Sequence, residues 1–123
     1  MKLQYDLGSA LYQEGREARK NGDLKAAIRK LRRSGKLAPH FKTYELLGES
    51  FFEMERFPEA ILYLAAAAAL GNKQFRSRYL LAKALLAIDE EADAISKLKE
   101  AIEIQPTYKA AKELLNGILS TSK

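Results

Sequence analysis

Few residues of this chain are suited to covalent chemistry. The 123 residues include no cysteine and a single histidine, His40, which directly follows Pro39. The absence of cysteine removes thiolate ligands, cysteine nucleophiles and disulfides, and a lone histidine has no second ligand for a metal site. The acidic cluster at 89–93 lacks the glycine and the spacing of a calcium loop, and no nucleophile motif or phosphate-binding loop is present. We therefore expect no enzyme activity, no cofactor and no metal.

Basic side chains offer a different chemistry, the recognition of anions. The net charge is +5, and residues 1–40 alone carry ten Lys and Arg against four Asp and Glu. Five of these cations follow one another at steps of four, three, one and three residues, which places them on one face of a helix. These residues, named here the basic stripe, are Lys25, Arg29, Arg32, Arg33 and Lys36.

The basic stripe has two interpretations. It could contact phosphates or an acidic protein, although a solvated outer face is the commoner reason for such a pattern. No aromatic residues interleave the stripe, whereas proteins that bind single strands normally supply rings for stacking. We therefore treat nucleic acid as a disfavoured partner and an acidic protein as an alternative one.

The chain has no segment typical of membrane insertion. The longest apolar run, Ile61–Leu70, contains ten residues, whereas roughly 20 are needed to span a bilayer. The first residues lack the apolar core of a secretory signal. We expect a protein without a membrane partner, in the cytoplasm.

The elements that must position these residues are helices, because apolar residues recur at three- and four-residue spacings along most of the chain. Gly22, Pro39, Gly71 and Pro106 interrupt the pattern. The predicted helices run at about 6–21, 24–37, 41–54, 57–71, 75–88, 91–104 and 107–119.

One short pattern occurs three times along the chain. The small residues Gly15, Gly48 and Ala82 are separated by 33 and 34 positions. Each is followed by an alanine twelve positions later and a leucine sixteen positions later. A period near 34 is typical of stacked helix pairs. We predict an all-α superhelix in one domain, 1–123, with three helix-turn-helix repeats at about 8–40, 41–74 and 75–108 and a terminal capping helix at about 107–119, because the last pair of a stack exposes an apolar face.

The pattern resembles the tetratricopeptide repeat, a helix-turn-helix unit of 34 residues. The positions that carry the resemblance are Leu11, Glu14, Gly15, Ala18, Ala27, Leu31, Ser34 and Pro39 in the first unit; Tyr44, Leu47, Gly48, Phe51, Ala60, Leu64, Ala67 and Asn72 in the second; and Arg78, Leu81, Ala82, Leu85, Ala94, Leu98, Ala101 and Pro106 in the third. The chain departs from the family in having no tryptophan and in placing Asn72 where a proline is usual.

The resemblance implies a concave groove lined by the first helix of each pair. The groove residues that we predict on this basis are Tyr12, Arg16, Leu46, Glu49, Phe52, Arg76, Tyr79, Leu80, Lys83 and Leu86. This mixture suits a peptide with apolar anchors and acidic residues. The alternative is that some of these residues, Phe52 and Leu86 above all, complete the packing between repeats.

A known use of such grooves is a clamp of lysine, asparagine and arginine side chains for the carboxylate of chaperone tails. The corresponding positions here hold Tyr12, Arg16, Leu46, Arg76 and Leu80. Only Arg76 keeps a comparable charge in place, and Arg16 adds one where a neutral amide is expected, so this use is disfavoured.

The resemblance leads to three hypotheses of function. The first is a non-catalytic adaptor or chaperone-like module that binds a segment of another protein in the groove. The second is a structural module that assembles into a homo-oligomer. The third is a binder of nucleic acid or an acidic protein through residues 25–36.

Overall fold

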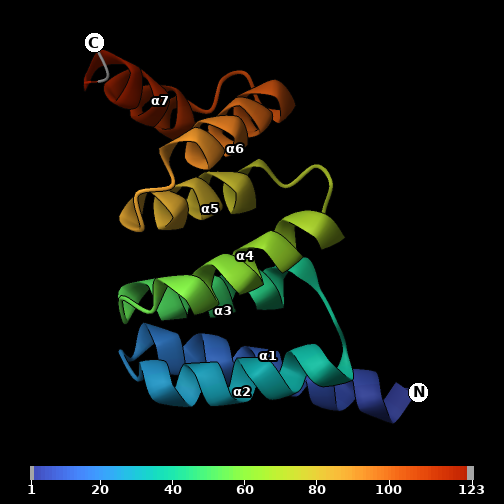
Figure 1. Cartoon of the computed structure of the whole chain (residues 1–123). Coiled ribbons are helices and arrows are strands. Elements are labelled where there is room, and N and C mark those ends of the chain that lie inside the picture. The colour runs from blue at the N-terminus through green and yellow to red at the C-terminus, as the bar shows by residue number, and fades with distance from the viewer. Residues whose placement is uncertain (1, 122–123) are drawn as a thin grey trace.

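The computed structural model describes residues 2–121, which form seven α-helices joined by short connections (Figure 1). The helices are α1 Lys2–Lys20, α2 Leu24–Leu37, α3 Phe41–Glu53, α4 Phe57–Leu70, α5 Phe75–Ala87, α6 Glu91–Ile104 and α7 Lys109–Thr121. Successive helices pack in pairs, α1 with α2, α3 with α4, and α5 with α6, and α7 packs on α6. The described residues contain no strand, so the predicted all-α superhelical class is confirmed.

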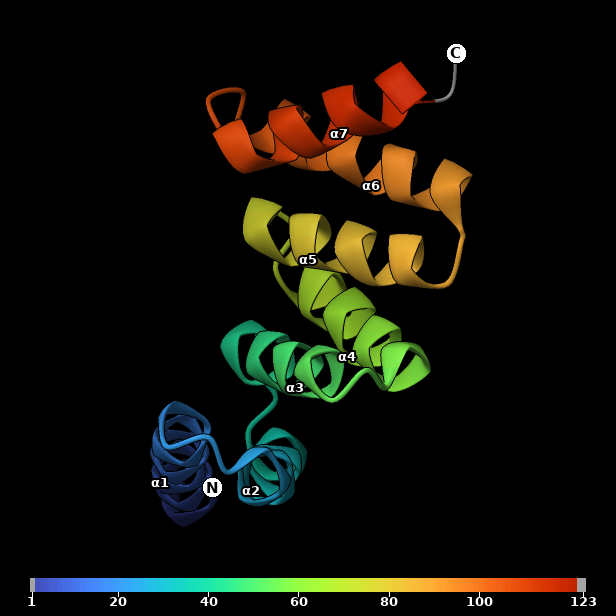
Figure 2. The same ribbon diagram turned by 90° about the vertical axis from the view of Figure 1, so that its left-hand side faces the viewer.

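The pairs stack so that first helices lie on one side and second helices on the other. Figure 2 shows α1 and α3 on one side, with α2 and α4 opposite them. We call these the first-helix and second-helix faces. The predicted division of the chain into repeats at 8–40, 41–74 and 75–108 remains our proposal for its domain organisation.

Two predicted helix boundaries are wrong. The first helix begins at Lys2 instead of about residue 6, and Gln4 Nε2 donates to the Leu37 carbonyl oxygen at 2.9 Å, which attaches this extension to the end of α2. The capping helix occupies 109–121 instead of about 107–119. Tyr108 directly precedes α7; its amide donates to the Gln105 carbonyl at 3.0 Å, and its own carbonyl accepts the first bond of the helix from Lys112 N at 3.3 Å.

The turns within the three pairs share one geometry. Gly22, Glu55 and Asp89, spaced 33 and 34 residues apart, all have positive φ, at 81°, 58° and 61°. Around Gly22, its amide donates to the Arg19 carbonyl and the next amide donates to the Ala18 carbonyl, which is the Schellman pattern that satisfies the last carbonyls of a helix. The same two bonds recur in the other turns. Left-handed geometry suits glycine and strains glutamate and aspartate.

Close contact within each pair depends on the small residues. A Cβ atom on Gly48 would lie 2.4 Å from Leu64 Cγ, and one on Gly15 would lie 2.6 Å from Leu31 Cγ. Both leucine side chains are buried, so neither can move aside easily. The glycines at these positions therefore allow the paired helices to approach closely.

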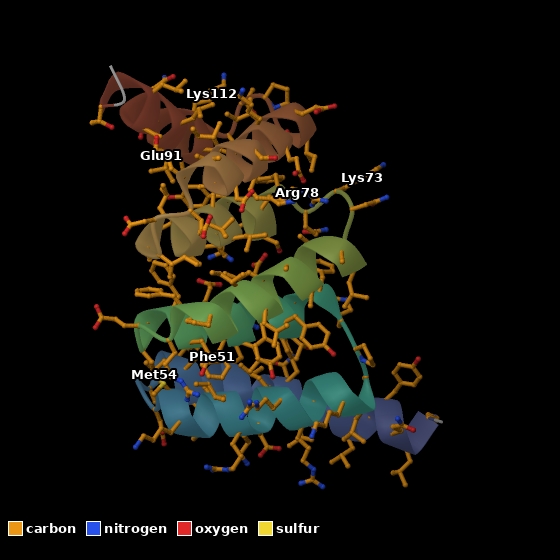
Figure 3. The ribbon with its side chains drawn as sticks, viewed as in Figure 1. Phe51, Met54, Lys73, Arg78, Glu91 and Lys112 are labelled. Carbon is orange, nitrogen blue, oxygen red and sulfur yellow. The ribbon has the colours of Figure 1, made fainter. Side chains whose placement is uncertain are left out.

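The core consists of two adjoining clusters that meet at α5. One includes Leu31, Phe51 and Leu64, between α2, α3, α4 and α5, and Figure 3 shows Phe51 in this region. The other includes Leu98 and Ile118 and lies between α5, α6 and α7. The capping helix thus buries apolar residues against the last pair, as the sequence predicts.

Arg78 stands at a position where the family has a large apolar residue, and its side chain is only 13% exposed. Its guanidinium donates to the carbonyls of Ala68, Gly71 and Gln74, and to Glu100 Oε1 at 3.1 Å. Figure 3 shows Arg78 beside the connection between α4 and α5. Since carbonyls at a helix C-terminus lack intrahelical partners, Arg78 stabilises the connection that lacks the usual proline.

The amino end of the stack is closed by charge. In α3 and α5 the positions that face the preceding second helix are buried, namely Thr43, Leu47, Ser50, Ser77, Leu81 and Ala84. The equivalent positions of α1 are Ala10, Glu14 and Glu17, and all three are exposed. Glu14 instead pairs with Lys30 Nζ at 2.6 Å. A further repeat stacked here would bury carboxylates, which is costly.

The carboxyl end is closed in a similar way. Ala111 and Ile118 of α7 are buried, whereas Lys112 and Asn116 are exposed at the positions equivalent to Arg78 and Ala82. Figure 3 shows Lys112 at this end of the stack. α7 therefore presents Lys112 and Asn116, beside the exposed Leu119, where a partner helix would otherwise pack.

We expect Gly48→Ala to destabilise the fold by about 1–3 kcal/mol, because the new methyl group overpacks a core that cannot relax. Gly117→Ala is the matched control, since a Cβ atom added there would meet nothing within 4 Å, and it should stabilise α7 by about 0.5–1 kcal/mol. Urea unfolding followed by circular dichroism measures both changes. A Gly48 variant as stable as the parent would contradict the close-approach argument.

We expect Glu55→Gly to stabilise the protein by about 0.5–1 kcal/mol, because glycine adopts the positive φ without strain. The reverse change at the equivalent turn, Gly22→Ala, should destabilise by about 1 kcal/mol, although open space surrounds that position. Thermal unfolding distinguishes the two variants. Equal midpoints would mean that these turns carry no strain.

Candidate functional site

The first-helix face contains two hollows that span repeats. The first has a volume of about 420 Å³ and lies between α1, α3 and the start of α5; its lining residues are Tyr12, Arg16, Phe41, Lys42, Glu45, Leu46, Gln74, Phe75 and Arg76. The second has a volume of about 200 Å³ and lies nearer the ends of α3 and α5; its lining residues are Glu49, Phe52, Glu53, Leu64, Leu80 and Lys83. We call them the α1 hollow and the Phe52 hollow.

Eight of the ten predicted groove residues line one of these two hollows. The other two, Tyr79 and Leu86, pack against the C-terminal core cluster. The Tyr79 ring lies edge-on to Tyr108, with 5.4 Å between ring centroids. Tyr79 therefore contributes to packing between α5 and the start of α7, which is the alternative the sequence left open for individual groove residues.

A network of ion pairs joins the three first helices across this face. Arg76 of α5 bonds to Glu45 and Glu49 of α3, with Nη1 2.9 Å from Glu49 Oε1. Arg19 of α1 bonds to Glu49 at 3.3 Å and to Glu53. Glu49, whose side chain is 13% exposed, therefore accepts from arginines of both neighbouring repeats. Since direct packing between α1, α3 and α5 is sparse, this network is their main link.

The ion-pair network determines which charged side chains of the groove could still pair with a ligand. Its bonds to Glu49 raise the pKa of the Arg76 guanidinium above its usual range, so Arg76 is committed to α3. The three carboxylates of α3 are likewise paired. Within residues 2–121, Arg16 and Lys42 beside the α1 hollow have no ion pair. The groove therefore offers cations, while its acidic groups are neutralised.

Arg19, Glu45 and Glu53 are the members of this network that the predicted groove set lacks. The position of Arg19 could be found from the repeat period, because the equivalent residue 33 positions later is Phe52, which is in the predicted groove set. The Arg19 Nε atom is buried and has no hydrogen-bond partner in the described structure. Arg19 Nε is therefore an unused hydrogen-bond donor.

The Phe52 hollow is lined by one aromatic ring, two leucines, two glutamates and a lysine. Lys83 Nζ lies 5.4 Å from the centroid of the Phe52 ring and 5.6 Å from that of Tyr79. A cation over a ring face is attracted by the π electrons. Phe52 also contacts Phe57 edge-on, which keeps its ring in place. The hollow thus combines an apolar wall with a positive charge at its edge.

The basic stripe lies on the outer side of α2. All five of its residues are exposed, but Arg32 differs from the others. Its Nε donates to the Tyr63 hydroxyl at 3.2 Å, and its guanidinium lies over the Phe51 ring at 5.6 Å. Aromatic residues from the next repeat therefore do contact the stripe, although their rings belong to the core and are not free for stacking.

His40 caps a helix. Its Nδ1 accepts from the Lys42 amide at 3.1 Å at the start of α3, and its ring stacks on Phe41. In the part of the chain that the structure describes, no three His, Cys, Asp or Glu side chains are placed to share a metal ion. Over the same residues, no helix is both long and apolar enough to cross a bilayer.

These features define a helical repeat protein with a hollowed first-helix face. The sequence matches the tetratricopeptide repeat family over residues 12–74 and again over residues 45–109. The chain belongs to this family. No curated protein matches the sequence.

Solved structures share the fold. The TPR domain of OM64 from Arabidopsis is 17% identical, with a TM-score of 0.91, over 96% of this chain and 98% of that one. The first TPR of Spaghetti (RPAP3), bound to an HSP90 peptide, is 18% identical with a TM-score of 0.90, over 94% and 93%. The TPR2B domain of yeast Sti1, in complex with pHsp70, is 23% identical with a TM-score of 0.83, over 94% and 98%. The TM-scores of these three structures establish that they share the fold of this chain, and nothing beyond the fold.

We expect Glu49→Gln to destabilise the protein by about 1–2 kcal/mol, because it weakens charge-assisted bonds to both Arg19 and Arg76. The stability of the variant should also depend less on salt than that of the parent. Glu113→Gln is the control, since its pair with Lys109 is exposed and 3.7 Å long; it should change stability by less than about 0.5 kcal/mol. Urea unfolding at low and high salt tests this. If the two substitutions changed stability equally, the ion-pair network would stabilise the fold no more than the exposed Lys109–Glu113 pair does.

Proposed function

We propose that the protein is a non-catalytic adaptor or chaperone-like module, which binds a peptide segment of a partner protein in the groove of its first-helix face. The observation that carries this proposal is the pair of adjoining hollows, which eight predicted groove residues line. Two of the structurally similar domains are complexes with an HSP90 peptide and with pHsp70. That the protein works in the cytoplasm is part of the same proposal.

The chemistry of the groove favours a partner with apolar anchors next to acidic residues. The Phe52 hollow has an apolar wall formed by Phe52 and Leu80, suited to an aliphatic or aromatic side chain. Arg16, Lys42 and Lys83 supply positive charge along both hollows. Because the acidic groups of α3 are already paired, they do not repel an acidic peptide strongly.

A chaperone C-terminal tail is a poor candidate for this groove. Of the five clamp positions, Tyr12, Leu46 and Leu80 have no positive charge for a carboxylate, and Arg16 places its charge where a neutral amide is expected. The remaining match, Arg76, is engaged by Glu45 and Glu49. A tail carboxylate would have to displace both before it could bind.

Self-assembly is the second candidate, and the ends of the stack argue against one form of it. Glu14 and Glu17 at the amino end, and Lys112 and Asn116 at the carboxyl end, are exposed where further repeats would pack. End-to-end stacking of copies would bury these groups, which is costly unless Glu14 and Glu17 pair with Lys112 of the next copy. An oligomer formed through another surface would leave these groups exposed to solvent.

The groove proposal is tested by selecting peptides from a displayed library on the purified protein. Selected peptides should combine apolar and acidic residues, and Arg16→Glu with Lys83→Glu should weaken their binding about tenfold or more. The matched control is Arg29→Glu with Arg33→Glu, an equal change of charge on the second-helix face. A peptide that ends in the sequence of an HSP90 tail should bind no better than a scrambled one. Peptides whose binding both double variants leave unchanged would place the site elsewhere.

A further inference from the structure

The outer sides of α2, α4 and α6 carry three strips of very different chemistry. The repeat spacing of 33 and 34 residues aligns Arg29 with Leu62 and Ser96, and Arg33 with Ala66 and Glu100. The α2 strip is therefore basic, the α4 strip apolar, and the α6 strip mixed. Figure 1 shows α2 and α4 together on the near side of the stack, with α1 and α3 behind them.

The α4 strip exposes leucine side chains to solvent. Leu62 is 63% exposed and Leu70 is 53% exposed, and they lie on one face of the helix with the partly buried Ala66 between them. Ala65 and Ala69 beside them are also exposed. A helix that is apolar nearly all round is typical of a buried element. Here its inner face is in the core and its outer face is uncovered.

The basic stripe adjoins this apolar strip. Arg32 of α2 contacts Tyr63 of α4 through the 3.2 Å hydrogen bond, so the two outer faces meet there. The remaining cations of the stripe have no ion pair with any residue in 2–121. The one carboxylate at the start of the α4 strip, Glu59, is paired with Arg56. An acidic ligand would therefore meet unpaired cations and little repulsion.

We propose that the outer faces of α2 and α4 form a second docking surface, which binds an amphipathic helix of a partner protein with apolar residues on one face and acidic residues beside them. The apolar residues would cover Leu62 and Leu70, and the acidic residues would pair with Arg29, Arg33 and Lys36. The small alanines let a second helix approach α4 closely, since the distance between helix axes depends on the side chains at the contact. This surface is separate from the groove of the first-helix face.

A second copy of this chain fits the surface less well. Packing two α4 strips together places basic stripe against basic stripe in one orientation, which is repulsive. In the other orientation the stripe faces α6, where Lys99 and Glu103 are exposed and Glu100 is already bonded to Arg78 and Lys97, so one exposed carboxylate would meet several cations. Charge complementarity thus favours an acidic partner over self-association.

The probe is a synthetic helical peptide of about 18 residues, or five turns, with leucines at three- and four-residue spacing and glutamates along one flank. We expect it to bind the full protein in fluorescence anisotropy, and to bind about tenfold or more weakly when Arg29→Glu and Arg33→Glu are combined. Leu62→Gln should have a similar effect. Replacing the peptide glutamates by lysine should abolish binding, and added salt should weaken it.

Each control makes the same type of substitution as a test variant, but outside the proposed surface. Lys99→Glu makes the same kind of charge change at the outer position of α6 equivalent to Arg32, and Leu119→Gln removes another exposed leucine, on α7. Both should bind the peptide like the parent, as should the groove variant Arg16→Glu with Lys83→Glu. Circular dichroism confirms that each variant is folded.

Several results would overturn the proposal. One is that the peptide fails to bind the parent protein. Another is that it binds the Arg29→Glu/Arg33→Glu and Leu62→Gln variants as tightly as it binds the parent. Another is loss of binding in the groove variant alone, which would assign the peptide to the groove. Binding of phosphatidylserine vesicles or of duplex DNA, without binding of the peptide, would replace the partner helix by a membrane or a nucleic acid.

Discussion

The close approach of two helices at one small residue is the constraint on which this structure depends. Leu31 and Leu64 lie against Gly15 and Gly48 at distances that leave no room for a side chain. This contact sets the separation of each pair, and the separation determines how the next pair can stack. The third pair has Ala82 at the equivalent position, so the spacing of the superhelix depends on small residues at all three positions. A larger residue at one of these positions disturbs its own pair first and its neighbours through it.

Much of the fold follows from patterns in the sequence that have a direct physical meaning. The period of 33 and 34 residues predicts the helix pairs, and the helices at 24–37 and 91–104 begin and end where the apolar spacing and the breakers place them. The start of α1 is harder to predict, because residues 2–5 lack a buried face and are held by a single side-chain bond from Gln4. Local contacts of this kind leave no periodic signal.

The candidate site is predictable in outline but not in its electrostatics. Helical periodicity identifies residues that point away from the packing face, and most of the predicted set does line the two hollows. Helical periodicity does not predict which charged groups form ion pairs between repeats. Arg76 reads as a free cation in the sequence, yet it is bonded to two carboxylates of α3. Conversely, Tyr79 reads as a groove residue, yet it rests on Tyr108, an aromatic residue 29 positions later in the chain. Both outcomes depend on tertiary contacts that spacing alone does not encode.

The charged ends of the stack have a consequence for how such a protein can change in length. An additional repeat attached at either terminus would meet Glu14 and Glu17, or Lys112 and Asn116, beside the few exposed leucines Leu3 and Leu7, or Leu119. A repeat duplicated between α4 and α5 would instead meet the same apolar faces that α4 and α5 now present to each other. Growth of the array is therefore favoured from within, and its two outermost helices would be carried along unchanged as its length increases.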